Sequence, residues 1–300
     1  MKRILAVVLS LAATPTLAAP GDWVNGVLPV ATPLALASVD LPVTLRRANP
    51  AQEAWAQQTP DQRLVYNVSK PQLIVWPSSL PADADAPAVL LVPGGGFQFL
   101  AMDNEGFDVA RRLDKLGVRV FIVKYRTQPV PDSIEGFRQA LGNLFQKGAP
   151  VDLTNRDYAV ADTQAAIRLV RKEAARWHVN PAKVGILGFS AGAMTTLATT
   201  QANAADARPD FVGMIYGPTE KSDVPANAPP LFAAIAADDR FFIKQDFGLF
   251  HAWRQSGAKV EFHLYSAGGH GFASQPNGTT SDAWFDQYAL WLKANGIVSR

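Results

Sequence analysis

The stretch GILGFSAGAM, residues 185–194, decides the fold, because it places Ser190 between two glycines where an apolar run gives way to a helical stretch. The run KVGIL (183–187) is typical of a buried strand, and AGAMTTLATTQA (191–202) is typical of a helix. A serine on a sharp strand-to-helix turn exposes its hydroxyl, and glycines on both sides leave space for the turn. The pattern alone also fits an ordinary turn, so the rest of the chain must decide between the two interpretations.

The regions around this stretch alternate between predicted strands and helices. Two short runs at 64–68 and 73–76 are predicted as neighbouring strands or one bent strand. Further apolar runs predict strands at 88–92, 118–125, 183–187, 211–216, 231–236 and 260–265. Helical spacing predicts helices at 105–117, 134–146, 156–177, 191–202, 247–257 and 281–296. Strands separated by helices imply an α/β fold with a mostly parallel central sheet and helices on both faces.

The first twenty residues, MKRILAVVLSLAATPTLAAP, combine a basic start, an apolar run and small residues near Ala18. This pattern predicts a signal peptide at residues 1–19 and a periplasmic or secreted protein. The apolar run is shorter than the roughly 20 residues that span a bilayer, so we do not expect it to be a membrane anchor. No membrane insertion is expected after the signal peptide is removed. Residues 20–60, rich in Pro and Ala, are expected to form an N-terminal arm on a single catalytic domain at 61–300.

Charge and cysteine content narrow the function. The formal net charge is +2, and loss of Lys2 and Arg3 with the signal peptide brings it to 0. A neutral protein has no general attraction for phosphate backbones, so nucleic acid is not an expected partner. The chain has 0 cysteines, which excludes disulfides, thiolate nucleophiles and cysteine-ligated zinc. The sequence indicates no oligomeric state.

A serine needs a base to take its proton, and one of the 4 histidines has the right setting. His178 lies at a predicted helix end, His251 within a helical run and His263 inside a predicted strand. His270 instead lies in the glycine-flanked loop SAGGHGF (266–272), after the last strand and before the last helix. The order serine, acid, histidine is the one this kind of fold uses, so His270 is the predicted base.

The acid that orients the imidazole should follow a strand between the serine and the histidine. The stretch LFAAIAADDRFF (231–242) supplies Asp238 and Asp239 directly after an apolar run, and either carboxylate could hold the ring. Asp223, in a loop, and Asp246, assigned to the helical region around 247–257, are poorer candidates.

Backbone donors for an oxyanion are also predicted. The stretch LLVPGGGF (90–97) places a glycine triplet straight after a strand, where the absence of side chains lets amides approach a substrate. The N–H groups of Gly95, Gly96 and Ala191, the residue after the serine, form the expected oxyanion hole.

From about Leu64 to its end, the chain resembles the α/β-hydrolase fold, and within it the esterase/lipase branch of acetyl-xylan-esterase-like carbohydrate esterases. The resemblance implies Asp239 as the acid, because the branch has an apolar residue two positions after it, here in Asp239-Arg240-Phe241. Pro93 stands where many relatives have histidine, and residues 127–156 differ from the usual connection and could form a lid or pocket wall. The segments that carry the resemblance are 67–76, 92–97, 102–126, 161–192, 228–242 and 268–272.

Together with the predicted signal peptide and the motifs above, this resemblance implies a secreted serine esterase with Ser190 as nucleophile, His270 as base and Asp239 as its orienting acid. The implied substrate is an acylated carbohydrate, a xylan-type polysaccharide or oligosaccharide that carries acetyl groups. The scheme requires neither a metal nor an organic cofactor. Three alternatives stay open at this point: a general short-chain carboxylesterase, a peptidase on the same fold, and a non-catalytic descendant that binds sugar or protein.

Overall fold

The structure is a computed structural model that describes residues 24–32, 36–43, 51–81, 85–146 and 150–299. The predicted signal peptide, residues 1–19, lies outside the described residues, as do parts of the predicted N-terminal arm. Across the described ranges, the helices are too short or too polar to cross a bilayer.

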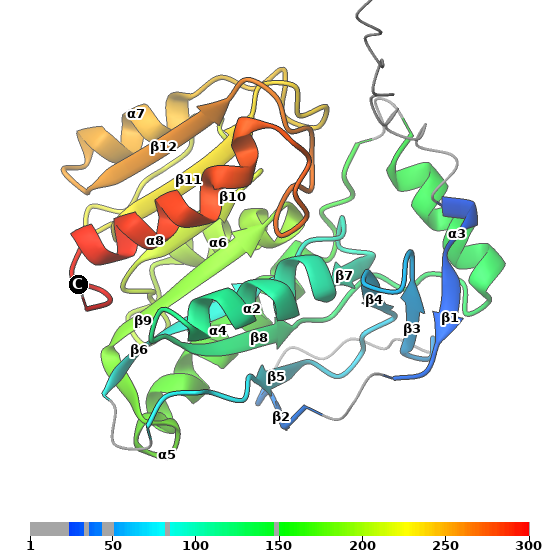
Figure 1. Ribbon diagram of the computed structural model, residues 1–300, viewed down its shortest axis with the longest axis horizontal. Coiled ribbons are helices and arrows are strands. Elements are labelled where there is room, and N and C mark those ends of the chain that lie inside the picture. The colour runs from blue at the N-terminus through cyan, green and yellow to red at the C-terminus, as the bar shows by residue number, and fades with distance from the viewer. Residues whose placement is uncertain (1–23, 33–35, 44–50, 82–84, 147–149, 300) are drawn as a thin grey trace, which may run out of the picture.

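An eight-stranded sheet forms the centre of the molecule (Figure 1). Its first six strands in spatial order pair in parallel, and the last two pair antiparallel at one edge. This confirms the mostly parallel sheet expected from the sequence. The order across the sheet is β12 (Val260–Tyr265), β11 (Leu231–Ala236), β10 (Val212–Ile215), β9 (Val179–Phe189), β6 (Ala86–Val92), β8 (Arg119–Lys124), β5 (Gln72–Val75) and β2 (Ser38–Asp40).

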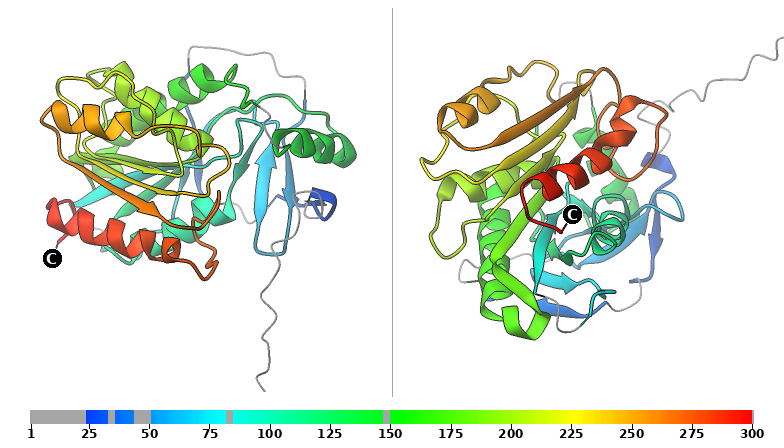
Figure 2. Two further views of the ribbon diagram at one scale, coloured as in Figure 1. Left: turned by 90° about the horizontal axis from the view of Figure 1, so that it is seen from above. Right: turned by 60° about the vertical axis from the view of Figure 1, so that its left-hand side comes forward.

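Helices cover both faces of this sheet, as the views of Figures 1 and 2 agree. On one face lie α2 (Asp108–Asp114) and α8 (Trp284–Ala294), and on the other lie α4 (Arg156–Lys172) and α6 (Ala191–Ala202). The short α5 (Ala174–Trp177) follows α4, and α7 (Gly248–Gln255) packs against the edge strand β12. The fold is therefore an α/β hydrolase fold, as predicted.

Burial explains why the central strands read as continuous apolar runs. All seven residues of β6 are buried, as are all six of β8 and of β11, because helices cover the sheet on both faces. One ionic pair lies in this interior: Arg126, just after β8, donates from its backbone N and its Nε to the carboxylate of Asp162 in α4, at 2.9 and 3.0 Å. The pair ties α4 to the carboxyl end of β8.

A second, four-stranded antiparallel sheet lies beside the first. Its order is β1 (Leu28–Val30), β3 (Ala54–Gln57), β4 (Arg63–Tyr66) and β7 (Phe99–Ala101). The helix α3 (Ile134–Leu144) packs on it, with the Phe137 ring stacked on Tyr66 at 3.9 Å between centroids. The described part of residues 20–60 thus contributes β1 and β3 to this sheet and β2 to the central one.

The two short runs at 64–68 and 73–76 are not neighbouring strands, and that prediction was wrong. They form β4 and β5, which belong to different sheets. The chain turns between them at Asn67, whose φ of 57° is left-handed. The side chain of Asn67 accepts from the N–H of Val130 and donates to its carbonyl, at 2.8 and 3.0 Å, which holds the turn.

The strand order reverses next to β6, and this reversal positions the candidate site. From β6 the chain moves to β8 on one side, and then returns to β9 on the other side before continuing to β12. Loops diverge at such a reversal, which leaves a crevice at the carboxyl ends of the strands. Because Val92 of β6 is in register with Gly188 of β9, the glycine loop and Ser190 emerge side by side.

Candidate active site

Ser190 lies on a tight turn between β9 and α6. Its φ of 51° and ψ of −119° are a conformation that non-glycine residues rarely adopt, and its N–H donates to the Ile215 carbonyl at 3.1 Å. A Cβ at Gly188 would lie 2.3 Å from the Gly192 oxygen, and a Cβ at Gly192 would lie 1.9 Å from the Val92 oxygen. Both glycines are therefore required for the close approach of strand and helix.

The structure brings Ser190, His270 and Asp239 together. The Ser190 Oγ and the His270 Nε2 are 2.7 Å apart, and the His270 Nδ1 and the Asp239 Oδ2 are 2.7 Å apart. The Asp239 side chain is fully buried, and the His270 side chain is 13% exposed. In this arrangement a carboxylate can hold the imidazole with its proton on Nδ1, which leaves Nε2 free to take the hydroxyl proton.

The neighbouring acid, Asp238, has a different contact. Its Oδ1 accepts from the Gly269 N–H at 2.8 Å, so it binds the backbone of the loop that carries His270. The Oδ1 of Asp239 accepts from the Phe241 N–H at 3.0 Å, which orients its Oδ2 toward the ring. Of the two carboxylates that the sequence left open, only Asp239 contacts the imidazole.

The other histidines and acids lie in structural settings. His178 ends α5 in a left-handed conformation with φ of 54°, and the His263 Nε2 lies 2.8 Å from the Glu261 carboxylate. Asp246 precedes α7 and does not lie within a helix, so that expectation was wrong. Its carboxylate accepts from the Gly248 N–H at 2.8 Å, at the start of that helix.

Aromatic rings surround the imidazole of His270. The ring centroids of Phe241, Tyr216 and Phe242 lie 4.6, 4.9 and 6.0 Å from it, the first two in edge-on contacts. These contacts restrict the rotation of the ring and shield it from water.

The glycine triplet follows β6 and lies against the serine turn. A Cβ at Gly94 would be 2.7 Å from the Cβ of Ser190. The N–H groups of Gly95, Gly96 and Ala191 have no acceptor among the described residues. Gly95 and Gly96 have φ of 135° and 58°, a conformation that favours glycine. The glycine loop and the first turn of α6 therefore present backbone N–H groups beside Ser190 that are free to bind an oxyanion.

A buried π-helix, η1 (Asp103–Phe107), binds two loops of the site. The Asn104 Nδ2 donates to the Gly271 carbonyl at 3.0 Å, and its Oδ1 accepts from the Ser274 N–H at 2.9 Å. Asn104 thus holds the loop that carries His270. π-helical turns are often found at functional sites.

Glu105, the next residue of η1, binds the glycine loop and an aromatic neighbour of His270. Its Oε2 accepts from the Gly94 N–H at 2.5 Å, and its Oε1 accepts from the Tyr216 hydroxyl at 2.8 Å. Burial raises the pKa of Glu105, against the effect of these two donors and of His270. Burial also raises the pKa of Tyr216 well above its usual value, and the Glu105 charge adds to the effect.

Sequence reasoning missed Asn104 and Glu105. Their only indication is a polar stretch, DNEG (103–106), inside an otherwise apolar region, and no motif assigns roles to it.

A cavity of ≈1000 Å³ lies between the start of the described chain, α3 and Arg240, the residue after Asp239. The Arg240 guanidinium lies 5.3 Å over the Phe145 ring and 4.8 Å over the Phe241 ring, and Phe241 contacts His270. Phe241 therefore contacts both Arg240, on the cavity wall, and the imidazole of His270. It is lined by Val24, Asn25, Glu135, Arg138, Gln139, Gly142, Asn143, Phe145, Gln146 and Arg240.

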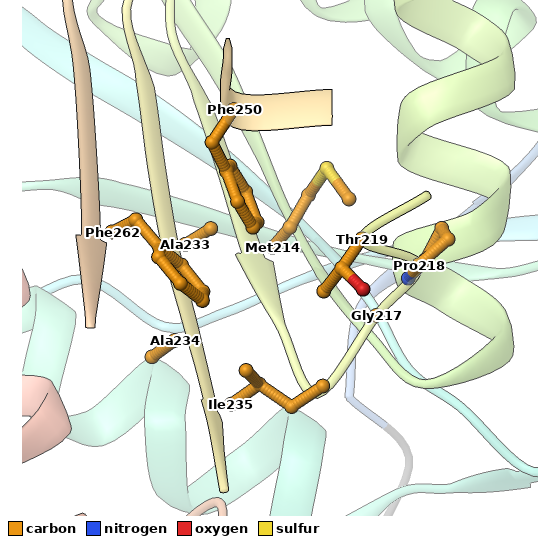
Figure 3. Close-up of a pocket in the computed structure, with 9 residues that line it drawn as sticks. All are labelled: Met214, Gly217, Pro218, Thr219, Ala233, Ala234, Ile235, Phe250 and Phe262. Atoms are coloured by element: carbon orange, nitrogen blue, oxygen red, sulfur yellow. The ribbon is translucent and has the colours of Figure 1, made fainter. Parts of the chain in front are cut away.

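A second hollow lies between β10, β11, β12 and α7 (Figure 3). It leaves no room for a water-sized sphere, and the rings of Phe250 and Phe262 are stacked 3.9 Å apart at its edge. We interpret it as a packing gap of the core and not as a binding site.

The fold and the residues beside Ser190 define the class of protein, an α/β hydrolase, and comparison with known proteins identifies its family. The model of the dienelactone hydrolase family matches residues 79–293. The chain therefore belongs to the dienelactone hydrolase family.

The chain is also similar to a curated esterase. The chain is 24% identical over 249 residues to an acetylxylan esterase of Xylanibacter ruminicola, covering 72% of this chain and 47% of that protein. The chain thus spans about half the length of this curated relative.

Solved structures show the same fold. One is an acetyl ester-xyloside bifunctional hydrolase from Caldicellulosiruptor lactoaceticus, with a TM-score of 0.58, 20% identity and coverage of 77% of this chain and 90% of that one. Another is the apo form of Thermogutta terrifontis esterase 2, with a TM-score of 0.59, 16% identity and coverage of 80% and 97%.

Proposed function

We propose that the protein is an exported serine carboxylic-ester hydrolase that removes acetyl groups from acylated carbohydrate, a xylan-type polysaccharide or its oligosaccharides. The hydrogen-bonded series from Ser190 through His270 to Asp239 carries this proposal. Hydroxyl, imidazole and carboxylate are at hydrogen-bond distance in that order, beside backbone amides that have no acceptor among the described residues. The basic and apolar start of the chain supports export.

The first half of the proposed reaction forms an acyl-enzyme. The Ser190 Oγ attacks the ester carbonyl carbon while its proton passes to the His270 Nε2, and Asp239 stabilises the imidazolium that forms. The N–H groups of Gly95, Gly96 and Ala191 donate to the tetrahedral oxyanion, each a contribution of about 10²–10³ in rate. His270 then gives its proton to the sugar oxygen, which leaves as an alcohol.

The second half releases the acid. Water attacks the carbonyl carbon of the acyl-serine and gives a proton to the His270 Nε2. The same amides stabilise the second oxyanion, and collapse returns the proton to the Ser190 Oγ as acetate leaves.

The similarity to an acetylxylan esterase supports an acetylated carbohydrate as substrate. The cavity of ≈1000 Å³ next to Arg240 supports it as well, because it offers room for the carbohydrate part of such a substrate near the proposed acid Asp239. The side-chain amides of Gln139, Asn143 and Gln146 on its wall can donate to and accept from sugar hydroxyls.

The experiment compares acetate release from acetylated xylan with hydrolysis of p-nitrophenyl acetate and its longer-chain homologues, by the wild type and by Ser190→Ala. The proposal expects acetate release from both acetylated substrates, and loss of both activities in the variant. Aryl ester hydrolysis without action on acetylated xylan would indicate a general short-chain carboxylesterase. Cleavage of aminoacyl amides alone would indicate a peptidase, and no labelling by a fluorophosphonate would indicate a non-catalytic binding protein.

A further inference from the structure

We propose that Glu105 is a positioning residue of this reaction, a buried anion that fixes the glycine loop through Gly94 and supports the imidazole of His270 through Tyr216. The inference rests on the proposed ester hydrolysis, and it assigns a role to a carboxylate that the mechanism above does not use.

The contact with Gly94 fixes the distance between the glycine loop and the serine turn. The Glu105 Oε2 accepts from the Gly94 N–H at 2.5 Å. A Cβ at Gly94 would lie 2.7 Å from the Ser190 Cβ and 3.0 Å from the Glu105 Oε2, so this residue is enclosed between the two side chains. Because Gly95 directly follows, any movement of Gly94 displaces the proposed oxyanion donors.

The contact with Tyr216 reaches the histidine. The Tyr216 hydroxyl donates to the Glu105 Oε1 at 2.8 Å, and its ring contacts the His270 ring edge-on, 4.9 Å between centroids. The backbone of Tyr216 has a left-handed φ of 38°, held by an N–H bond to the Ala234 carbonyl at 2.7 Å. Glu105 therefore fixes the far end of the ring that supports the imidazole.

The hydrogen-bond directions favour the ionised form of Glu105. The Gly94 N–H can only donate, and the Tyr216 hydroxyl, which is able to donate or to accept, donates to Oε1 in this structure, so both carboxylate oxygens act as acceptors. Burial raises its pKa, while the Gly94 amide, the Tyr216 hydroxyl and the charge of His270 lower it. Burial raises the pKa of Tyr125 well above its usual value, and the Glu105 charge adds to the effect; its hydroxyl donates to the Pro93 carbonyl at 2.7 Å.

A carboxylate in this place stabilises the imidazolium that forms when Ser190 is deprotonated, in addition to Asp239. Removing the charge should therefore lower kcat and move the acidic limb of the kcat/KM profile to lower pH.

The decisive variant is Glu105→Gln, which has nearly the same shape and keeps an amide oxygen for the Gly94 N–H. Its NH₂ group can donate to the Tyr216 oxygen, so the contacts persist without the charge. We expect kcat for p-nitrophenyl acetate to fall about tenfold, a fraction of the 10²–10³ lost with one oxyanion donor. KM should change much less, and the acidic limb should shift downward by about half a pH unit.

The control is Asp114→Asn, a buried carboxylate at the other end of the same helical region. Asp114 accepts from the Ser78 hydroxyl and the Ser79 N–H, both at 3.0 Å, with no contact to the site. This variant measures what neutralising a buried acid does to the fold alone, and its pH profile should match that of the wild type.

Tyr216→Phe keeps the ring on His270 and removes the hydroxyl that binds Glu105. It should also lower kcat, and the loss in the double variant with Glu105→Gln should be smaller than the sum of the two single losses in free energy. If Glu105→Gln does not fold, Tyr216→Phe decides, and an unchanged kcat in that variant overturns the inference.

If the wild type is active and Glu105→Gln has the same kcat and pH profile, this inference is overturned and the proposed function stays intact. Equal profile shifts in Glu105→Gln and Asp114→Asn overturn it as well. A wild type that hydrolyses no ester overturns the proposed function itself.

Discussion

Replacing Asp239 by asparagine tests the assignment of the acid, and the structure predicts how the variant fails. The Asp239 Oδ1 accepts from the Phe241 N–H at 3.0 Å, and an asparagine would keep this bond with its own oxygen. Its NH₂ group would then occupy the place of Oδ2, 2.7 Å from the His270 Nδ1. A donor in that place makes Nδ1 the acceptor and puts the ring proton on Nε2, which faces Ser190.

An imidazole with its proton on Nε2 cannot accept the hydroxyl proton, so kcat should fall by about 10⁴. At 1.36 kcal/mol for each factor of ten, this corresponds to about 5.4 kcal/mol of transition-state stabilisation. The measurement is kcat and KM for p-nitrophenyl acetate at neutral pH, with circular dichroism to show that the variant is folded.

Asp238→Asn is the matched control, because the two acids are adjacent in sequence. Asp238 is exposed, and an asparagine there can still accept from the Gly269 N–H through its side-chain oxygen. Its kcat should stay within about threefold of the wild type, since exposed substitutions of this kind change free energies by about 0.5 kcal/mol. Comparable losses in the two variants, or an Asp239→Asn enzyme that keeps a tenth of its activity, would refute the tautomer argument.

Three further predictions follow from the packing. Gly95→Ala puts a Cβ 2.1 Å from the Phe99 carbonyl oxygen at a φ of 135°, so the loop must shift and kcat should fall about 100-fold in steady-state assays. Arg126→Met leaves the buried Asp162 without its guanidinium partner, which should cost about 3–5 kcal/mol and lower Tm by about 5–10 °C in thermal melts. Burial raises the pKa of Tyr265 to about 12, so the folded state holds its proton longer than the unfolded chain and stability falls as pH rises from about 10. Urea unfolding over this pH range should show a shallower fall in Tyr265→Phe.

The site residues with local signatures could be predicted from the sequence. Ser190 lies in a strand-to-helix turn whose glycines are needed for close backbone contacts, and such contacts constrain the residue type directly. His270 could be predicted because it is the one histidine in a loop after a predicted strand, and a parallel sheet brings such loops to one edge. Choosing Asp239 over Asp238 needed the family resemblance, since both acids follow the same strand.

The second sheet could not be predicted, because strand pairing is non-local. Residues 64–68 and 73–76 have similar composition, and their separation into two sheets depends on the turn at Asn67 and on partners far along the chain. Short-range periodicity contains no information on which strands pair.

The π-helix η1 shows why part of the site is invisible in the sequence. Asp103, Asn104 and Glu105 are only 5%, 9% and 5% exposed, and burying polar groups costs free energy unless each finds a partner. Their partners lie in other elements: Asp103 binds Arg63 of β4, and Asn104 and Glu105 bind the loops of His270 and of the glycine triplet. The glycine loop and the loop of His270 are separated by more than 170 residues of sequence, so no local pattern predicts that one segment binds both. Because one five-residue turn binds both loops at once, η1 contributes to the spacing between the proposed base and the proposed oxyanion donors.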